Sequence, residues 1–189
     1  MKLIDNKILL NVLNGYVDYF PNERNNLRIL LQQIKAHQDI TSRRNFQGHI
    51  TGSAIILSPD KHQVLLIFHN HFQLWQQPGG HWDDDETPLQ VARREAEEET
   101  HVKIKAYLPI DSKSPLIPLD IDTHKVSARP LKDEPAHWHH DIRYLFLASD
   151  TALKHQANEV SAAVWYNLDD PLAARISVCI EKIRDLHMA

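Results

Sequence analysis

The sequence predicts an α/β layered domain in which helices cover a mixed β-sheet, preceded by a helical hairpin. Three observations lead to this prediction. Apolar residues recur every three or four positions over the first 40 residues, as they do along a helix. From His49 onward, short runs rich in β-branched residues alternate with turn signals. Two more helical patterns, at about 87–100 and 171–187, lie among and after these runs.

The N-terminal segment is expected to form two helices. The first spans about residues 3–20, with an apolar stripe that includes Leu9, Leu13 and Tyr16, and Pro21 ends it. The second carries Leu27, Leu30, Leu31 and Ile34 along one face. We therefore expect a helical extension over residues 1–45 and a main domain over residues 46–189. The extension could pack on the main domain or form the interface of a homodimer, and the sequence leaves both open.

The main domain begins with an expected β-hairpin. Its strands cover residues 50–57 and 64–68, and the Ser-Pro-Asp-Lys segment between them is a turn signal. Further strands are expected at 72–77, 102–108, 116–127, 141–148 and 162–167. Pro78, Gly79 and Gly80 are expected to form a turn that ends the strand at 72–77. Residues 109–115 and 128–136 are expected to be loops, and Pro171 should open a C-terminal helix that runs to about His187.

Composition and charge narrow the class of protein. A chain of 189 residues suffices for one domain with a full core. The net charge of −4 disfavours nucleic-acid binding, which usually needs a basic surface. The single cysteine, Cys179, excludes an internal disulfide and suits a reducing compartment. No apolar run approaches the roughly 18 residues of a membrane span, and the N-terminus lacks signal-peptide features. We expect a cytoplasmic protein that binds neither membrane nor nucleic acid.

The helix expected at about 87–100 has a well-specified start. Thr87 is a good N-cap, Pro88 suits the first helical position, and Gln90 completes a capping box.

The same helix should carry three carboxylates on one side. At about 100° per residue, Glu95, Glu98 and Glu99 fall within one arc of about 100°, whereas Glu97 points away. Like charges at these spacings destabilise a helix by a few tenths of a kcal/mol per pair. A divalent cation would turn this repulsion into binding, and clustered carboxylate oxygens suit Mg²⁺ or Mn²⁺. A solvated acidic helix face is the alternative.

The wider spacing favours the metal site, because this segment resembles the Nudix box. The polar and glycine positions of that motif match in register, and an apolar residue fills its last position: Gly80, Glu86, Arg94, Glu95, Glu98, Glu99 and Val102. Two positions depart from the motif. Ala96 is a small apolar residue, and His101 replaces a glycine that would serve a helix end with positive φ, so we expect a slightly altered helix exit. The resemblance covers roughly residues 48–188 and implies an α+β fold, the Nudix-type α/β/α sandwich with a mixed sheet.

The resemblance also implies an activity, the hydrolysis of a diphosphate linkage in a small nucleotide-type substrate. The implied ligands of Mg²⁺ or Mn²⁺ are the three helix carboxylates, the Gly80 carbonyl and a later loop acid: Glu95, Glu98, Glu99, Gly80 and Glu159. Glu95 or Glu98 would act as general base toward water. Arg94 would pair with the helix glutamates and orient them, and Glu86 would be an outer partner or a water-mediated ligand.

Histidines form a second notable pattern among the 13 in the chain. If the strand expected at 141–148 extends back to His137, then His137, His139, Asp141 and Arg143 share one face. Trp138, His140, Ile142, Tyr144 and Phe146 would share the other and be buried. His81 follows the Gly-Gly turn, and His124 lies on the neighbouring expected strand. His81, His124, His137, His139 and Arg143 could contact substrate phosphate. The histidines could instead bind a transition metal or form a polar sheet face.

Substrate signals are weak. Pro118 lies near the position of a proline that is typical of members that hydrolyse ADP-ribose. Dinucleoside polyphosphate hydrolases often have a tyrosine slightly further along the chain, and Leu119 and Asp120 occupy that region here. A nucleotide, a nucleotide sugar or an ADP-ribose-type substrate all stay open. A catalytically silent Nudix-fold regulator that binds a nucleotide is the alternative from a different class, and transition-metal binding by the histidines as the main role is a third.

Overall fold

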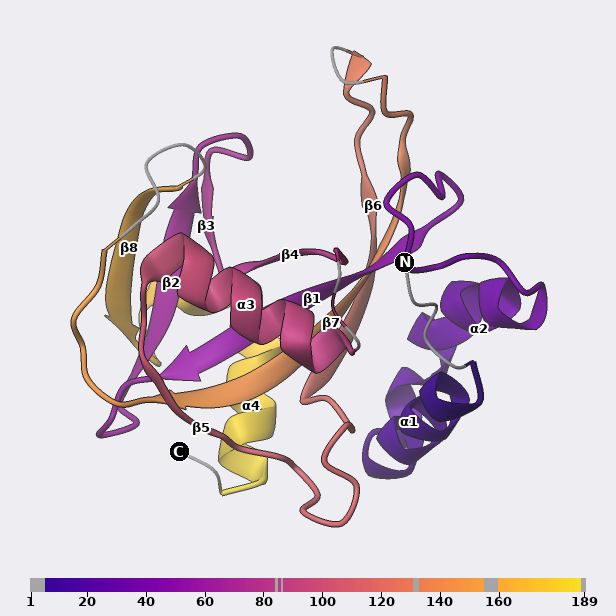
Figure 1. Ribbon diagram of the computed structural model, residues 1–189. Coiled ribbons are helices and arrows are strands. Elements are labelled where there is room, and N and C mark those ends of the chain that lie inside the picture. The colour runs from indigo at the N-terminus through magenta and orange to yellow at the C-terminus, as the bar shows by residue number, and fades with distance from the viewer. Residues whose placement is uncertain (1–5, 84, 86, 131–132, 155–159, 188–189) are drawn as a thin grey trace.

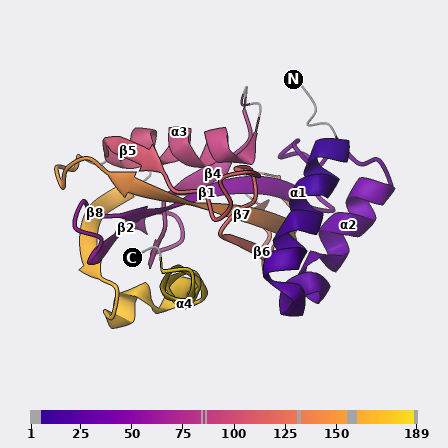
Figure 2. The same ribbon diagram turned by 90° about the horizontal axis from the view of Figure 1, so that it is seen from below.

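The structure is a computed structural model that describes residues 6–83, 85, 87–130, 133–154 and 160–187. Eight strands form one mixed sheet in this part of the chain, and helices cover both of its faces. Helix α3 (Pro88–Thr100) lies on one face and α4 (Ser177–Asp185) on the other, while α1 and α2 pack at one end (Figures 1 and 2). The expected α/β/α sandwich is confirmed. None of the helices among the described residues combines the length and the apolar composition of a membrane span.

The N-terminal helices pack against the sheet. Helix α1 (Asn6–Tyr19) ends before Pro21, the 3-10 helix η1 (Pro21–Leu27) follows, and α2 (Arg28–Lys35) completes the hairpin. Their apolar stripe is buried in one core with residues of the sheet, including Leu13, Leu30, Ile50, Ile121 and Ile142. Of the two expected roles, packing on the main domain is therefore the one that the structure shows.

The centre of the sheet is a parallel pair. Strand β1 (His49–Leu57) runs parallel to β7 (His137–Ala148), and every other pairing is antiparallel. On one side of this pair, β1 is hydrogen-bonded to β2 (Gln63–His69). Strand β2 in turn pairs with β3 (Leu74–Gln76) and β8 (Val160–Asn167). On the other side, β7 pairs with β5 (Ile104–Tyr107) and β6 (Asp120–Val126).

Several expected boundaries were wrong. Gly79–His81 is not a turn but the short strand β4, which pairs with residues 51–53 of β1. Strand β7 begins at His137, because its first residues still pair with β1 and β6. Trp138 is half-buried rather than buried. The C-terminal helix is divided into the 3-10 helix η3 (Pro171–Ile176) and α4, and Asp170 caps the first of these with its side chain.

Helix α3 lies directly across β1, and Gly52 permits this approach. A Cβ at Gly52 would lie 2.5 Å from the carbonyl oxygen of Pro88, which is closer than real contacts allow. The expected capping box is present at the start of the helix, with reciprocal bonds between Thr87 and Gln90. The helix ends at His101, which takes the left-handed conformation with φ 52° and donates its N–H to the carbonyl of Glu97. The C-terminus of the helix therefore has the backbone conformation that is usual for glycine, although the residue there is a histidine.

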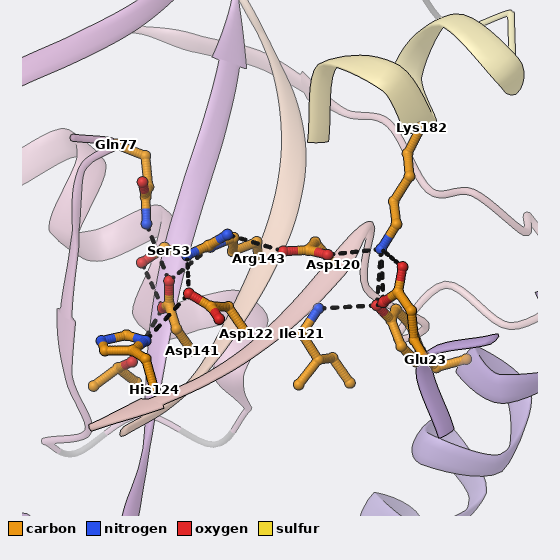
Figure 3. A network of polar contacts seen from close by, with 12 residues as sticks. Glu23, Ser53, Gln77, Asp120, Ile121, Asp122, His124, Asp141, Arg143 and Lys182 are labelled. Atoms are coloured by element: carbon orange, nitrogen blue, oxygen red, sulfur yellow. Dashed lines mark hydrogen bonds and ion pairs between the residues drawn. The ribbon is translucent and has the colours of Figure 1, made fainter. Parts of the chain in front are cut away.

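A buried polar network joins the N-terminal helices and α4 to the sheet (Figure 3). Lys182 of α4 donates from Nζ to Asp120 of β6 at 2.6 Å and to the hydroxyl of Tyr16 at 2.9 Å, and it pairs with Glu23 at 2.8 Å. The Tyr16 oxygen also accepts the backbone N–H of Ile121 at 3.1 Å. The contacts therefore connect four elements from both ends of the chain.

Candidate active site

The three carboxylates of α3 differ in their surroundings. Glu99 is buried, and one of its carboxylate oxygens accepts the backbone N–H of Gly79 at 3.0 Å. The side chain of Glu95 is 15% exposed and that of Glu98 is 56% exposed. Glu97 pairs with Arg93 on another side of the helix, as expected. The predicted arc therefore runs from a buried, anchored carboxylate to one that is open to solvent.

Arg94 fixes two of these carboxylates. Its Nη1 donates to Glu95 at 2.9 Å and to Glu98 at 3.2 Å. Its Nε and Nη2 donate to both oxygens of Asp85, and Nη2 also donates to the carbonyl of His81 at 2.9 Å. A guanidinium has five N–H donors, and these contacts use all five. Arg94 therefore contacts Glu95, Glu98, Asp85 and the backbone of His81 at the same time.

The guanidinium of Arg94 stays charged. Partial burial lowers its pKa, but the hydrogen bonds with Asp85 and the charge of Glu95 outweigh this effect and raise the pKa above its usual value. The positive charge reduces the repulsion between the Glu95 and Glu98 carboxylates, which the sequence places on one side of the same helix.

Gly80 makes room for the Glu95 carboxylate. A Cβ on Gly80 would lie 2.2 Å from Oε1 of Glu95, so any side chain there would displace that group. Strand β4 thus brings the backbone of residues 79 and 80 against the carboxylates of α3. The arrangement gathers hard oxygen ligands in one place, which is the donor set that Mg²⁺ and Mn²⁺ prefer.

The expected histidines lie together beside this centre. His124 of β6 pairs in register with His139 of β7, and His81 of β4 has its ring centroid 5.2 Å from that of His139. Nε2 of His137 lies 3.0 Å from Nε2 of His139. Burial lowers the pKa of His81 to about 3 and that of His139 to about 2, with the neighbouring histidines contributing. The hydrogen bond to Asp122 raises the pKa of His124.

Arg143 lies in a different setting from the one expected. Its guanidinium is buried and donates to Asp120, Asp122 and Asp141 at 2.8–2.9 Å (Figure 3). Asp141 in turn accepts from Ser53 and from Gln77. This arrangement fits a structural role, since three carboxylates already accept the hydrogen bonds of the N–H groups that would otherwise bind a substrate phosphate.

Two residues of the candidate site were not predicted from the sequence, and two predicted ones lie outside the described residues. Asp85 holds Arg94, yet it is one of three consecutive aspartates that nothing local distinguishes. His49 joins the histidines through the parallel pairing of β1 with β7, which places it opposite His139. Glu86 and Glu159 lie outside the part of the chain that the structure describes.

Comparison with known proteins agrees with this geometry. The chain matches the family model of the NUDIX domain over residues 48–184. A NUDIX-family hydrolase of Clostridium perfringens shares the fold, with a TM-score of 0.54 at 22% identity over 74% of this chain and 97% of that chain. An Ap4A hydrolase of C. elegans also shares the fold, with a TM-score of 0.51 at 16% identity over the same shares.

One curated relative matches a shorter stretch. It is the CMP-5'-(N-acetyl-N-hydroxy-3-aminopropyl)phosphonate hydrolase of Streptomyces rubellomurinus, which is 44% identical over 54 residues. The match spans about a quarter of each protein, 26% of this chain and 26% of the relative. The family model covers more than half of the chain, and the sandwich, the capped acidic helix and the clustered carboxylates accord with it. The chain therefore belongs to the Nudix family of hydrolases.

Proposed function

We propose that the protein is a divalent-metal-dependent hydrolase that cleaves a diphosphate linkage in a nucleotide derivative. The observation that carries the proposal is the gathering of Glu95, Glu98 and Glu99 against the backbone of Gly80, with Arg94 fixing two of them. The space that Gly80 leaves, together with a donor set of oxygen atoms, fits Mg²⁺ or Mn²⁺. The three glutamates and the Gly80 carbonyl would hold the metal, and Glu159 is retained as a further proposed ligand.

Each residue has a distinct part in this proposal. When bound, the metal would supply charge neutralisation for the diphosphate oxygens and a lowered pKa for water. Glu98 is the better placed general base, because its side chain is the more exposed and can reach solvent water. Glu99 is buried and anchored to Gly79, so it would act as a ligand only. Arg94 would keep Glu95 and Glu98 in place throughout.

The substrate side is proposed to lie toward the histidines. His81 follows Gly80 directly, and it lines a shallow depression together with His139, Arg43 and Arg129. His124 lies opposite His139 on the neighbouring strand, and it is the histidine whose pKa is raised, so it is the first choice for a contact with phosphate. The curated relative is named for a CMP-linked phosphonate, which makes cytidine nucleotides linked to an anionic group a first choice to test.

A substrate screen tests the proposal. Nucleoside di- and triphosphates, nucleotide sugars, ADP-ribose, dinucleoside polyphosphates and CMP-linked phosphonates would be assayed with Mg²⁺ or Mn²⁺. Glu98→Gln should lower kcat by about 10²–10⁴-fold, the usual effect of losing a general base. Glu97→Gln is the matched control, since this residue lies on the same helix but pairs with Arg93. If wild type and Glu98→Gln are equal on every substrate, the enzymatic proposal fails and the silent nucleotide-binding regulator becomes the better account.

Calorimetry tests the metal ligands separately. Mg²⁺ or Mn²⁺ binding should weaken in Glu95→Gln and in Glu99→Gln and stay unchanged in Glu97→Gln. Equal binding in all three variants would refute the assignment of these carboxylates.

A further inference from the structure

A cluster of imidazoles lies beside the carboxylate centre, and the proposed hydrolysis uses its members for substrate contact only and not as metal ligands. His49 begins β1, and His137 and His139 lie at the start of β7, its parallel neighbour. One ring nitrogen of each histidine lies within 4.8 Å of those of the other two. All three side chains are buried, and His49 is only 1% exposed. Three imidazoles converge here on one point from two adjacent strands.

Backbone carbonyls set the tautomers of two of these rings. Nδ1 of His137 lies 2.7 Å from the carbonyl oxygen of Pro135, and Nδ1 of His49 lies 3.3 Å from that of Asn45. A carbonyl oxygen can only accept, so each Nδ1 carries the proton. In a neutral imidazole the other nitrogen then presents a bare lone pair. A distal N–H bonded to a backbone carbonyl is the usual support of a metal-ligating histidine.

The lone pair of His49 lacks a partner. Among the side chains of the described residues, its Nε2 is the buried nitrogen or oxygen atom without a hydrogen bond. The lone pair of His137 meets Nε2 of His139 only if the latter carries a proton. Buried polar atoms without a hydrogen bond are rare in native structures, and binding of an ion is one of the recognised explanations for them. A cation coordinated by all three Nε2 atoms would satisfy both lone pairs and release the His139 proton.

The type of ligand atom indicates which metal would bind. Nitrogen ligands select Zn²⁺ and its transition-metal neighbours, whereas Mg²⁺ and Mn²⁺ prefer the oxygens of α3. In a tetrahedral zinc site the Zn–N bonds are roughly 2.0–2.1 Å long, so the ligand nitrogens lie about 3.3 Å apart. The ring nitrogens of the three histidines lie within 4.8 Å of one another, so small side-chain movements would bring them to that separation.

We infer that His49, His137 and His139 form a binding site for a divalent transition metal, with Zn²⁺ as the first choice. His81 flanks the fourth position, because its ring centroid lies 5.2 Å from those of both His49 and His139. The carbonyl of His81 accepts from Arg94, so this residue stands between the histidine site and the carboxylates of α3. A three-histidine site with one open position is the arrangement of zinc sites that bind a further ligand.

Metal retention in the 189-residue chain tests this inference. The chelator-treated protein would be given Zn²⁺, freed of excess by gel filtration and analysed for zinc, and Co²⁺ would be added in parallel for its visible spectrum. Wild type should keep about one zinc per chain, and the double variant His137→Gln/His139→Gln less than a tenth of that. Glu98→Gln should keep all of it, which separates this site from the proposed hydrolysis. His71→Gln, on an exposed turn, is the control for adventitious surface binding.

Two outcomes would overturn the inference: a wild type that retains no zinc, or a double variant that retains as much as wild type. If the double variant does not fold, long-range ¹⁵N–¹H spectra of wild-type imidazoles replace it. Zn²⁺ should then shift Nε2 of His49, His137 and His139 and leave their Nδ1 protons in place. Spectra that do not change on addition of Zn²⁺ would equally refute the site.

Discussion

Replacing Lys182 with methionine would remove the cation that joins the N-terminal helices to the sheet. The Nζ atom of Lys182 contacts Asp120 at 2.6 Å, Glu23 at 2.8 Å and the Tyr16 hydroxyl at 2.9 Å, and the methylene stem is buried with it. Methionine keeps most of the stem and its apolar contacts, so the change reports mainly on the charge. We expect Lys182→Met to destabilise the protein strongly.

The structure sets the magnitude. Breaking a buried ion pair by removing one partner costs about 3–5 kcal/mol, because the other charge stays buried without its partner. Asp120 keeps Arg143 at 2.9 Å, and Glu23 is partly exposed to water, so the lower end, about 3 kcal/mol, applies. Adding Glu23→Gln to Lys182→Met removes the carboxylate that has lost its ion pair with Lys182 and should recover about 1 kcal/mol, a typical coupling energy for residues in contact.

Urea unfolding measures this prediction. The midpoint should fall without a change in slope, since the folded surface stays the same. Arg93→Met is the matched control: the Arg93–Glu97 pair is 57% and 43% exposed, and such pairs contribute about 0.3–0.5 kcal/mol. A Lys182→Met cost as small as that of the control would refute the reasoning that this network holds the helices to the sheet.

Three further predictions concern single positions. Gly80→Ala should remove most of the hydrolytic activity, because the new Cβ would lie 2.2 Å from Oε1 of Glu95; an unchanged kcat/KM on the best substrate would contradict this. His101→Gly should raise the free energy of unfolding by about 0.5–1 kcal/mol, because φ 52° strains a histidine and suits glycine. Thermal unfolding checks it, and a lower midpoint would count against it. Lowering the pH from 7 to 5 should cost about 2 kcal/mol of stability through His140, since burial lowers its folded pKa to about 4 from an ordinary 6.5. Between these values the unfolded chain binds the proton and the folded one does not, so this stability is present above pH 6.5 and is lost toward pH 4. Urea titrations at both pH values should show a smaller loss in His140→Gln, and an equal loss would argue against this cause.

Much of the candidate site could be predicted from the sequence because it lies on one helix. The 3.6-residue period places Glu95, Glu98 and Glu99 on one arc and Glu97 elsewhere, whatever packs around the helix. The capping box is likewise local, since its bonds join residues three positions apart. The Nudix family and its sandwich followed from the same segment.

The strand boundaries were less predictable because strands depend on their partners. Residues 79–81 form β4 only because β1 lies alongside, and nothing in the Gly-Gly-His segment itself favours a strand over a turn. The same cause moved the start of β7 back to His137. Arg143 was expected to face a substrate, but β6 brings Asp120 and Asp122 against it.

The sequence by itself determined the chemistry of the acidic helix, because helical geometry and capping act over a few consecutive residues. Only the tertiary structure decided which groups from other parts of the chain lie beside this helix in the candidate site. Asp85, nine positions before Arg94, binds its guanidinium from the segment that precedes α3. His49 meets His137 and His139 because β1 and β7 pair in parallel across about half the chain. No periodicity encodes such a meeting, since contacts between distant residues depend on the register of the sheet.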